Sequence, residues 1–172
     1  AFGRAQGWRV LPRRPVSGKD AKPGLLVFIH GGYWQELSAT DSLFAATECI
    51  RHGQAFAAID YTLAPAASVA DIVAECRKAL VWLFRHAPAW GVDASRIVVA
   101  GSSAGAHLAA MVSLPGTLPD GQGGAFAMRA VVLVSGIFDL EPLVATSINT
   151  ALGLTPASAQ QVSPAGFDLR GF

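Results

Sequence analysis

Charged residues are scarce in this sequence, and features that would indicate several other protein classes are missing. Only 15% of the 172 residues are charged and the formal net charge is +1, so neither nucleic acid nor an anionic membrane is indicated as a partner. No apolar run approaches the roughly 20 residues that a membrane-spanning helix needs, and the sequence does not open with a basic segment followed by an apolar one. We therefore expect a cytoplasmic protein without nucleic-acid or membrane contacts.

Cysteine is also rare, which limits the covalent and metal chemistry available. The two cysteines, Cys49 and Cys76, both fall in segments with helical periodicity, and two free thiols are expected rather than a disulfide. No C-x-x-C pair or cluster of histidine and cysteine suggests a metal site. We expect no metal and no cofactor.

Apolar residues, in contrast, make up 52% of the chain, as in sheets that are covered on both faces. Apolar strands alternate with helical patterns, which predicts an α/β fold with a mainly parallel sheet and helices on both faces. We treat residues 1–172 as one domain, with an irregular segment over 1–23, where Trp8–Leu11 fits an edge strand. Residues 136–172 form either a cap over the site or a surface connection. The expected parallel strands are Leu25–Ile29, Ala55–Ile59, Ile97–Ala100 and Ala130–Val134.

The strand ending at Ala100 leads into a G-x-S-x-G motif, Gly101 to Gly105, and then into a helical stretch rich in small residues. This context predicts a nucleophile elbow, in which Ser103 occupies a sharp turn above the sheet. The flanking glycines are explained by the lack of space for side chains in such a turn. The N–H of Ala104 opens the helix, where developing negative charge is favoured.

The strand over Leu25–Ile29 runs into His30, Gly31 and Gly32. An HGG loop after a strand is typical of the second half of an oxyanion hole, which acyl transfer requires together with a nucleophile. We expect Gly31 and Gly32 to share this role with Ala104, and His30 to brace the loop through hydrogen bonds. The two motifs together predict an α/β-hydrolase.

Four stretches resemble the arylformamidase (kynurenine formamidase) branch of the α/β-hydrolases and the broader group of HGG esterases. The resemblance covers about Leu25 to Ser163, and the stretches that carry it are HGGYW at 30–34, DYTLAP at 60–65, GSSAGAH at 101–107 and SGIFDLEPL at 135–143. It implies hydrolysis of a small carboxylic ester or an N-formyl aryl amide. The related pattern usually has arginine in place of Thr62, so a structural ion pair or hydrogen bond near the sheet is expected to be lost.

Three aromatic residues, Tyr33, Trp34 and Phe138, are candidates for a substrate pocket that accepts an aromatic group. Ordinary packing explains each of them equally well. The acyl group and the oligomeric state, including a homo-oligomer, stay open.

The catalytic base is the missing part of this pattern. In the resembling enzymes the acid and the histidine follow the serine in that order, but the only histidine after Ser103 is His107, one helical turn further on. Asp139 and Asp168 are the later acids, and neither follows a suitable strand. We expect the acid and base to lie beyond residue 172 in a sheet that is incomplete at its C-terminal side, and turnover by this chain alone to be very weak.

Two classes of function therefore stay open. One is a serine hydrolase, or part of one, that acts through Ser103. The other is a catalytically inactive α/β-hydrolase scaffold or fragment that serves a binding role.

Overall fold

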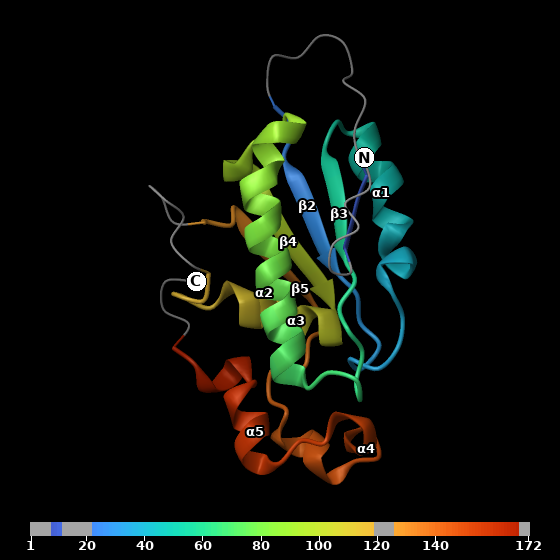
Figure 1. Cartoon of the computed structure of the whole chain (residues 1–172), viewed down its shortest axis with the longest axis vertical. Coiled ribbons are helices and arrows are strands. Elements are labelled where there is room, and N and C mark those ends of the chain that lie inside the picture. Colours follow the sequence, from blue (N-terminus) through green and yellow to red (C-terminus); the bar gives the residue numbers. More distant parts are fainter. Residues whose placement is uncertain (1–7, 12–21, 119–125, 169–172) are drawn as a thin grey trace.

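The computed structural model describes residues 8–11, 22–118 and 126–168, and its centre is a five-stranded sheet (Figure 1). The strand order is β1-β3-β2-β4-β5. Strand β1 is antiparallel to β3, and the other pairs are parallel. The strands are β1 (Trp8–Leu11), β2 (Leu25–Ile29), β3 (Ala55–Ile59), β4 (Ile97–Ser102) and β5 (Ala130–Val134). The four predicted parallel strands and the predicted edge strand are all confirmed. The remainder of the predicted 1–23 segment lies largely outside the described residues.

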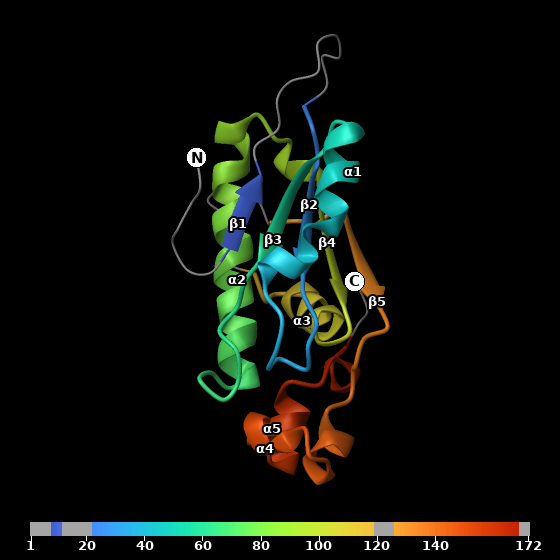
Figure 2. The same ribbon diagram turned by 90° about the vertical axis from the view of Figure 1, so that its right-hand side faces the viewer.

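Helices cover both faces of the sheet, as predicted (Figure 2). On one face lie α2 (Val69–His86) and α3 (Ala104–Ser113). The other face is covered by the 3-10 helix η1 (Ala39–Ala45) and by α1 (Ala46–Arg51). The segment with helical periodicity around Cys49 is thus divided between a 3-10 helix and an α-helix. At the carboxyl end of the strands lie α4 (Asn149–Leu152), α5 (Pro156–Gln161) and the 3-10 helices η4 (Glu141–Ala145) and η5 (Pro164–Gly166). Shorter 3-10 turns, η2 (Ala87–Trp90) and η3 (Ala94–Arg96), connect α2 to β4.

Helix α2 begins where its sequence predicts. Ser68 accepts a hydrogen bond from the N–H of Asp71, and the Asp71 carboxylate accepts one from the N–H of Ser68, which satisfies two N–H groups that a helix start leaves unpaired. Its apolar residues recur at helical spacing and are buried. Helix α2 can therefore cover the sheet with one continuous apolar stripe.

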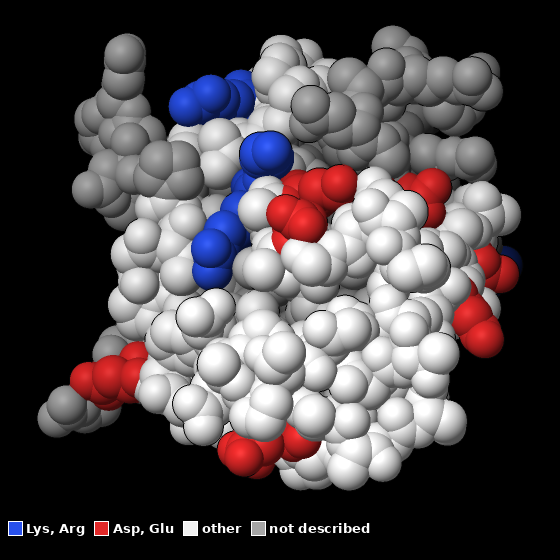
Figure 3. Space-filling view, turned by 60° about the horizontal axis from the view of Figure 1, so that its bottom comes forward, with Lys and Arg blue, Asp and Glu red and all other residues white. Residues whose placement is uncertain are grey.

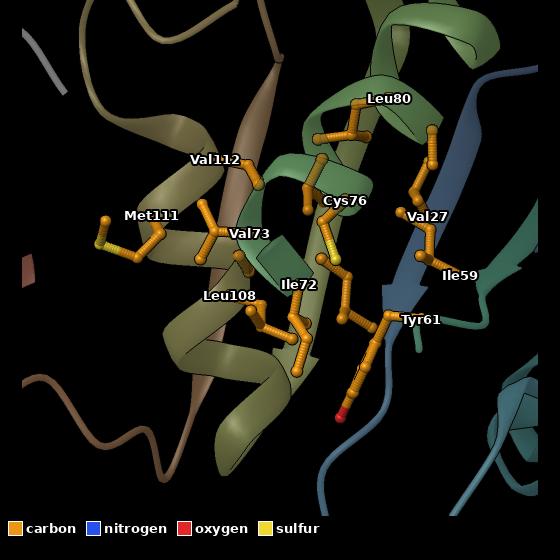
Figure 4. Packing of buried hydrophobic residues seen from close by; sticks show 14 of the residues in the cluster. Val27, Ile59, Tyr61, Ile72, Val73, Cys76, Leu80, Leu108, Met111 and Val112 are labelled. Carbon is orange, nitrogen blue, oxygen red and sulfur yellow. The ribbon is translucent and has the colours of Figure 1, made fainter. Parts of the chain in front are cut away.

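The core divides into two clusters because side chains alternate across a strand. Val27 and Ile29 of β2 belong to the larger cluster with α2 and α3, whereas Leu26 and Phe28 pack with Phe56 against α1. Figure 4 shows side chains of α2 and α3 meeting over the sheet, with Tyr61 at the end of the cluster beside the chain that leaves β2. A slip of one residue would exchange the side chains of the two faces, so the different sizes of the two clusters specify the register.

Candidate active site

Ser103 lies between β4 and α3 in a backbone conformation that non-glycine residues seldom adopt. Its φ is 54° and its ψ is −119°, a region whose occupation costs on the order of 1–3 kcal/mol and occurs mainly at functional sites. Ser102 ends β4, and the carbonyl of Ser103 accepts hydrogen bonds from the N–H groups of Ala106 and His107. The turn therefore has the strand, strained residue and helix order of the predicted elbow.

The two motif glycines are required by close backbone approach. A Cβ on Gly101 would collide with the carbonyl of Gly105, and one on Gly105 would collide with the carbonyls of Ile29 and His30. Helix α3 thus starts directly against the end of β2. This contact brings the elbow and the HGG segment together.

Strand register places Gly31 beside Ser103. Ile29 pairs with Gly101 in the parallel ladder between β2 and β4, so two residues further along Gly31 lies opposite Ser103. A Cβ on Gly31 would lie 2.8 Å from the Ser102 carbonyl oxygen and 3.3 Å from the Cβ of Ser103. Only a residue without a side chain allows the loop to approach the serine this closely.

The N–H groups around Ser103 are available to a ligand. In the described part of the chain, no residue accepts a hydrogen bond from the N–H of Gly31, Gly32 or Ala104. Ala104 is the first residue of α3, and helix geometry leaves such an N–H without an intrahelical acceptor. The two motifs therefore contribute unpaired donors from two sides of the same serine.

The HGG segment continues in left-handed backbone. The φ angles of Gly32, Tyr33 and Trp34 are 94°, 48° and 61°, and the N–H groups of Gln35 and Glu36 close the turn by donating to the Gly32 carbonyl. A Cβ on Gly32 would collide with the backbone of Glu36. Sequence reasoning did not anticipate this strained run, because Tyr and Trp carry no signal for positive φ.

The three predicted pocket residues lie in different surroundings. Tyr33 is 47% exposed, whereas Trp34 has no exposed surface. Phe138 is half-buried, and its ring lies against the Cα of Gly136. The contacts of Trp34 are those of a core residue, and a pocket role for Tyr33 and Phe138 stays a prediction.

His107 joins three segments of the chain. Its Nε2 donates to the Val162 carbonyl at 2.6 Å, so Nδ1 carries the lone pair that accepts from Nε1 of Trp34 at 3.2 Å. Burial lowers the pKa of His107 to about 4, and the side chain is fully buried. With both nitrogens occupied, His107 is a neutral structural residue in this arrangement.

His30 braces the HGG segment, as predicted. Its Nδ1 is 2.9 Å from the carbonyl oxygen of Gly31, so this nitrogen carries the proton and donates. Nε2 lies 3.8 Å from Oδ1 of Asp60, while burial lowers the pKa of His30 against the opposing influence of the Gly31 carbonyl and Asp60. The ring is 2% exposed and is held within the loop it supports.

The other two histidines contact groups elsewhere. His52 pairs with Glu48, and His86 bonds the Trp82 carbonyl. All four histidines of the sequence are thus described, and none contacts the Ser103 hydroxyl. Asp139 accepts from the N–H of Glu141, and Asp168 is exposed.

Thr62, the departure from the family pattern, makes two hydrogen bonds to Glu75. Its N–H and its hydroxyl donate to the two carboxylate oxygens of Glu75 at 2.8 and 2.9 Å. The predicted loss of an arginine contact near the sheet stays a prediction. A cleft of about 560 Å³ lies beside this pair, lined by Leu37, Ser38, Asp60, Tyr61, Thr62, Leu63, Glu75 and Lys78.

The described residues hold neither a metal-binding cluster nor a membrane-spanning helix. Residues 8–11, 22–118 and 126–168 contain no group of three or more histidine, cysteine or acidic side chains arranged to hold a metal ion. No helix among them is both long enough and apolar enough to span a bilayer. Cys49 and Cys76 are free thiols, as the sequence predicts.

Comparisons with known proteins agree with this geometry. The BD-FAE family matches residues 14–164. A kynurenine formamidase from Danio rerio is 34% identical over 167 residues, which cover 96% of this chain and 54% of that protein. The chain thus spans about half the length of this relative.

Solved structures show the same fold over nearly the whole chain. A protein from Silicibacter sp. TM1040 has a TM-score of 0.78 and 30% identity, with 98% of this chain and 60% of that chain covered. Esterase 2 from Thermogutta terrifontis, in its propionate-bound form, has a TM-score of 0.69 and 28% identity, with 92% and 61% covered. The chain therefore belongs to the BD-FAE family of α/β-hydrolases and is similar to the kynurenine formamidases and esterases within that fold.

Proposed function

We propose that Ser103 is the nucleophile of a hydrolase that cleaves small carboxylic esters or N-formyl aryl amides. The oxyanion donors in this proposal are the N–H groups of Gly31, Gly32 and Ala104. The single observation that carries it is the approach of Gly31 to Ser103, where a Cβ would lie 3.3 Å from the serine Cβ. Acyl transfer needs N–H donors and a nucleophile at one point, and here the nucleophile would be the hydroxyl of a serine whose backbone is strained.

The chemistry follows from this arrangement. Oγ of Ser103 attacks the substrate carbonyl carbon, and the carbonyl oxygen gains the negative charge that the three N–H groups stabilise. Collapse of the tetrahedral intermediate expels the alcohol or amine and leaves an acyl-serine, which water hydrolyses. The serine proton needs an acceptor that afterwards gives it to the leaving group, and His107 is not that acceptor, because both of its nitrogens are occupied.

The surroundings of the site fit an uncharged substrate. No residue between Pro142 and Phe167 is charged, and these residues build the helices at the carboxyl end of the strands (Figure 1). Viewed from this end, the surface has large uncharged areas and only a few groups of charged side chains (Figure 3). The formamide alternative is supported by the similarity to the Danio rerio kynurenine formamidase and by the aromatic candidates Tyr33 and Phe138.

The test is hydrolysis of an aryl acetate and of an N-formyl aryl amide by the protein made from its complete reading frame. The Ser103→Ala variant should lose at least ~10³-fold in kcat/KM for both substrates, since removal of the nucleophile leaves only the oxyanion donors and binding. The matched control is Ser102→Ala, which removes the neighbouring hydroxyl and should retain activity. A folded protein that hydrolyses neither substrate would instead support the non-catalytic scaffold, and activity that survives Ser103→Ala would contradict the assignment.

A further inference from the structure

Tyr61 lies in the same register row as the two residues at the centre of the site. Ile59 of β3 pairs with Ile29 of β2, and Ile29 pairs with Gly101 of β4. Two residues beyond each strand partner, Tyr61, Gly31 and Ser103 therefore follow one another across the carboxyl edge of the sheet. The aromatic residue and the serine flank the glycine loop from opposite sides.

The hydroxyl of Tyr61 holds two consecutive carbonyls of this loop. It lies 3.1 Å from the carbonyl oxygen of His30 and 3.0 Å from that of Gly31, so one O–H proton is shared between two acceptors. The Gly31 carbonyl also accepts from Nδ1 of His30. The rings of Tyr61 and His30 stack with their centres 4.1 Å apart and their planes 12° apart, and Tyr61 is 5% exposed.

Peptide geometry converts these contacts into an orientation of the oxyanion donors. In a trans peptide the C=O and the next N–H point in opposite directions. When Tyr61 draws the carbonyls of His30 and Gly31 to its own side, the N–H groups of Gly31 and Gly32 are turned away from it. Gly31 has no side chain to resist rotation, so its two peptides need an external restraint to keep one orientation.

We propose that Tyr61 is a positioning residue that sets the oxyanion hole through its hydroxyl. The inference rests on the proposed function, because it assumes that the N–H groups of Gly31 and Gly32 stabilise a developing oxyanion at Ser103. Tyr61 does not touch the reacting atoms. It acts through the two carbonyls, and burial, which raises its pKa far above the ordinary value for tyrosine, keeps the hydroxyl protonated and able to donate.

The test compares Tyr61→Phe with Thr62→Val in the protein made from its complete reading frame. Tyr61→Phe keeps the stacked ring and removes the donor, whereas Thr62→Val removes a hydroxyl from the same loop that bonds Glu75 instead. We expect Tyr61→Phe to lower kcat about 10- to 100-fold with little change in KM, less than the loss of a whole oxyanion donor. Thr62→Val should change kcat less than threefold.

A second readout separates oxyanion positioning from a general structural role. Sulfur accepts hydrogen bonds more weakly than oxygen, so a well-oriented hole hydrolyses an aryl ester much faster than its thionoester. Tyr61→Phe should shrink this ester-to-thionoester ratio at least fivefold, while a variant that is merely less folded lowers both rates equally. A Tyr61→Phe protein that is active on the ester with an unchanged ratio would overturn the inference.

Two further variants distinguish a failure of this inference from a failure of the proposed function or of folding. Ester hydrolysis that survives Ser103→Ala would remove the proposed function itself, independently of any result at Tyr61. If Tyr61→Phe does not fold, 4-aminophenylalanine at position 61 replaces it, since this residue keeps a weaker donor in the same place. An intermediate ester-to-thionoester ratio would then support the inference, and a ratio equal to that of the unmodified protein would contradict it.

Discussion

Every residue of strands β3 and β5 is apolar, but the two strands have opposite environments. All five residues of β3, AFAAI, are buried, whereas in β5, AVVLV, Val132, Leu133 and Val134 are 47%, 37% and 50% exposed. Strand β3 lies between β1 and β2 and is covered on both faces, while β5 pairs, among the described residues, with β4 alone. Composition therefore predicts that a segment is a strand, but its neighbours decide whether the strand is buried.

The two sides of the candidate site, next to β3 and next to β5, differ in the same way. On the side toward β3, His30 and Tyr61 are buried and hydrogen-bonded to the HGG segment. On the side toward β5, the elbow is tied by one bond from the Ser103 N–H to the Val134 carbonyl. The central strands position the nucleophile and donors, and stability measurements should therefore respond far more strongly to changes there than to changes in β5.

The largest effect is expected at the contact between the elbow and β2. Gly105→Ala should lower the free energy of unfolding by more than about 4 kcal/mol, because the new Cβ meets backbone atoms of Ile29 and His30 that cannot move independently. Urea denaturation measures this change. The matched control is Gly166→Ala, where nothing lies within 4 Å of the added Cβ, and a Gly105→Ala protein as stable as this control would contradict the described contact.

A smaller, pH-dependent effect is expected from His107 beneath the elbow. Burial lowers its pKa from 6.5 to about 4, so the unfolded chain takes up the proton first and stability falls as pH drops from about 6.5 toward 4. The shift corresponds to a loss of about 3 kcal/mol at most. Above pH 6.5 this contribution is fully present.

Denaturant titrations at pH 7 and at pH 4.5 measure the effect. His107→Gln retains a donor for the Val162 carbonyl and an acceptor for Trp34 without a titrating group, and should reduce the pH dependence by the amount attributed to His107. An unchanged pH dependence in this variant would show that other groups cause the acid sensitivity.

The smallest effect on stability is expected in β5, for a Val→Ala substitution that is compared with the same substitution in β4. Val99 is fully buried in β4, and Val132 is 47% exposed in β5. In a protein made of residues 1–172, Val99→Ala should cost about 2–3 kcal/mol from lost burial and a residual cavity, whereas Val132→Ala should cost less than about 0.5 kcal/mol. Equal losses at the two positions would mean that β5 is covered in solution, for example by a second copy of the chain.

Much of the fold follows from local sequence pattern. The apolar runs at 25–29, 55–59, 97–100 and 130–134 predicted the parallel strands, and the glycines at 101 and 105 predicted the elbow, because both signals depend on neighbours in sequence. The role of Tyr61 was not predicted. It depends on the register between β2 and β3, which places a residue 30 positions away beside Gly31.

The contact between Trp34 and His107 was also not predictable from local sequence pattern. In the sequence, Trp34 was a candidate pocket residue, His107 was the only histidine after Ser103, and each stands next to a catalytic motif. Their bond to one another joins positions 73 residues apart, and no periodicity encodes it. The exposure of β5 does not follow from its own residues, since an entirely apolar strand suits burial on both faces.

The most direct test of the central assignment is the site of covalent modification by a fluorophosphonate ester. This reagent reacts with activated serine hydroxyls, and its transition state places negative charge on an oxygen that the oxyanion donors would hold. Peptide mapping by mass spectrometry should find one adduct on Ser103 in the protein made from its complete reading frame. The adduct should disappear in Ser103→Ala and persist in Ser102→Ala, whereas modification of Ser102 or of a serine outside the elbow, with hydrolysis intact, would contradict the account.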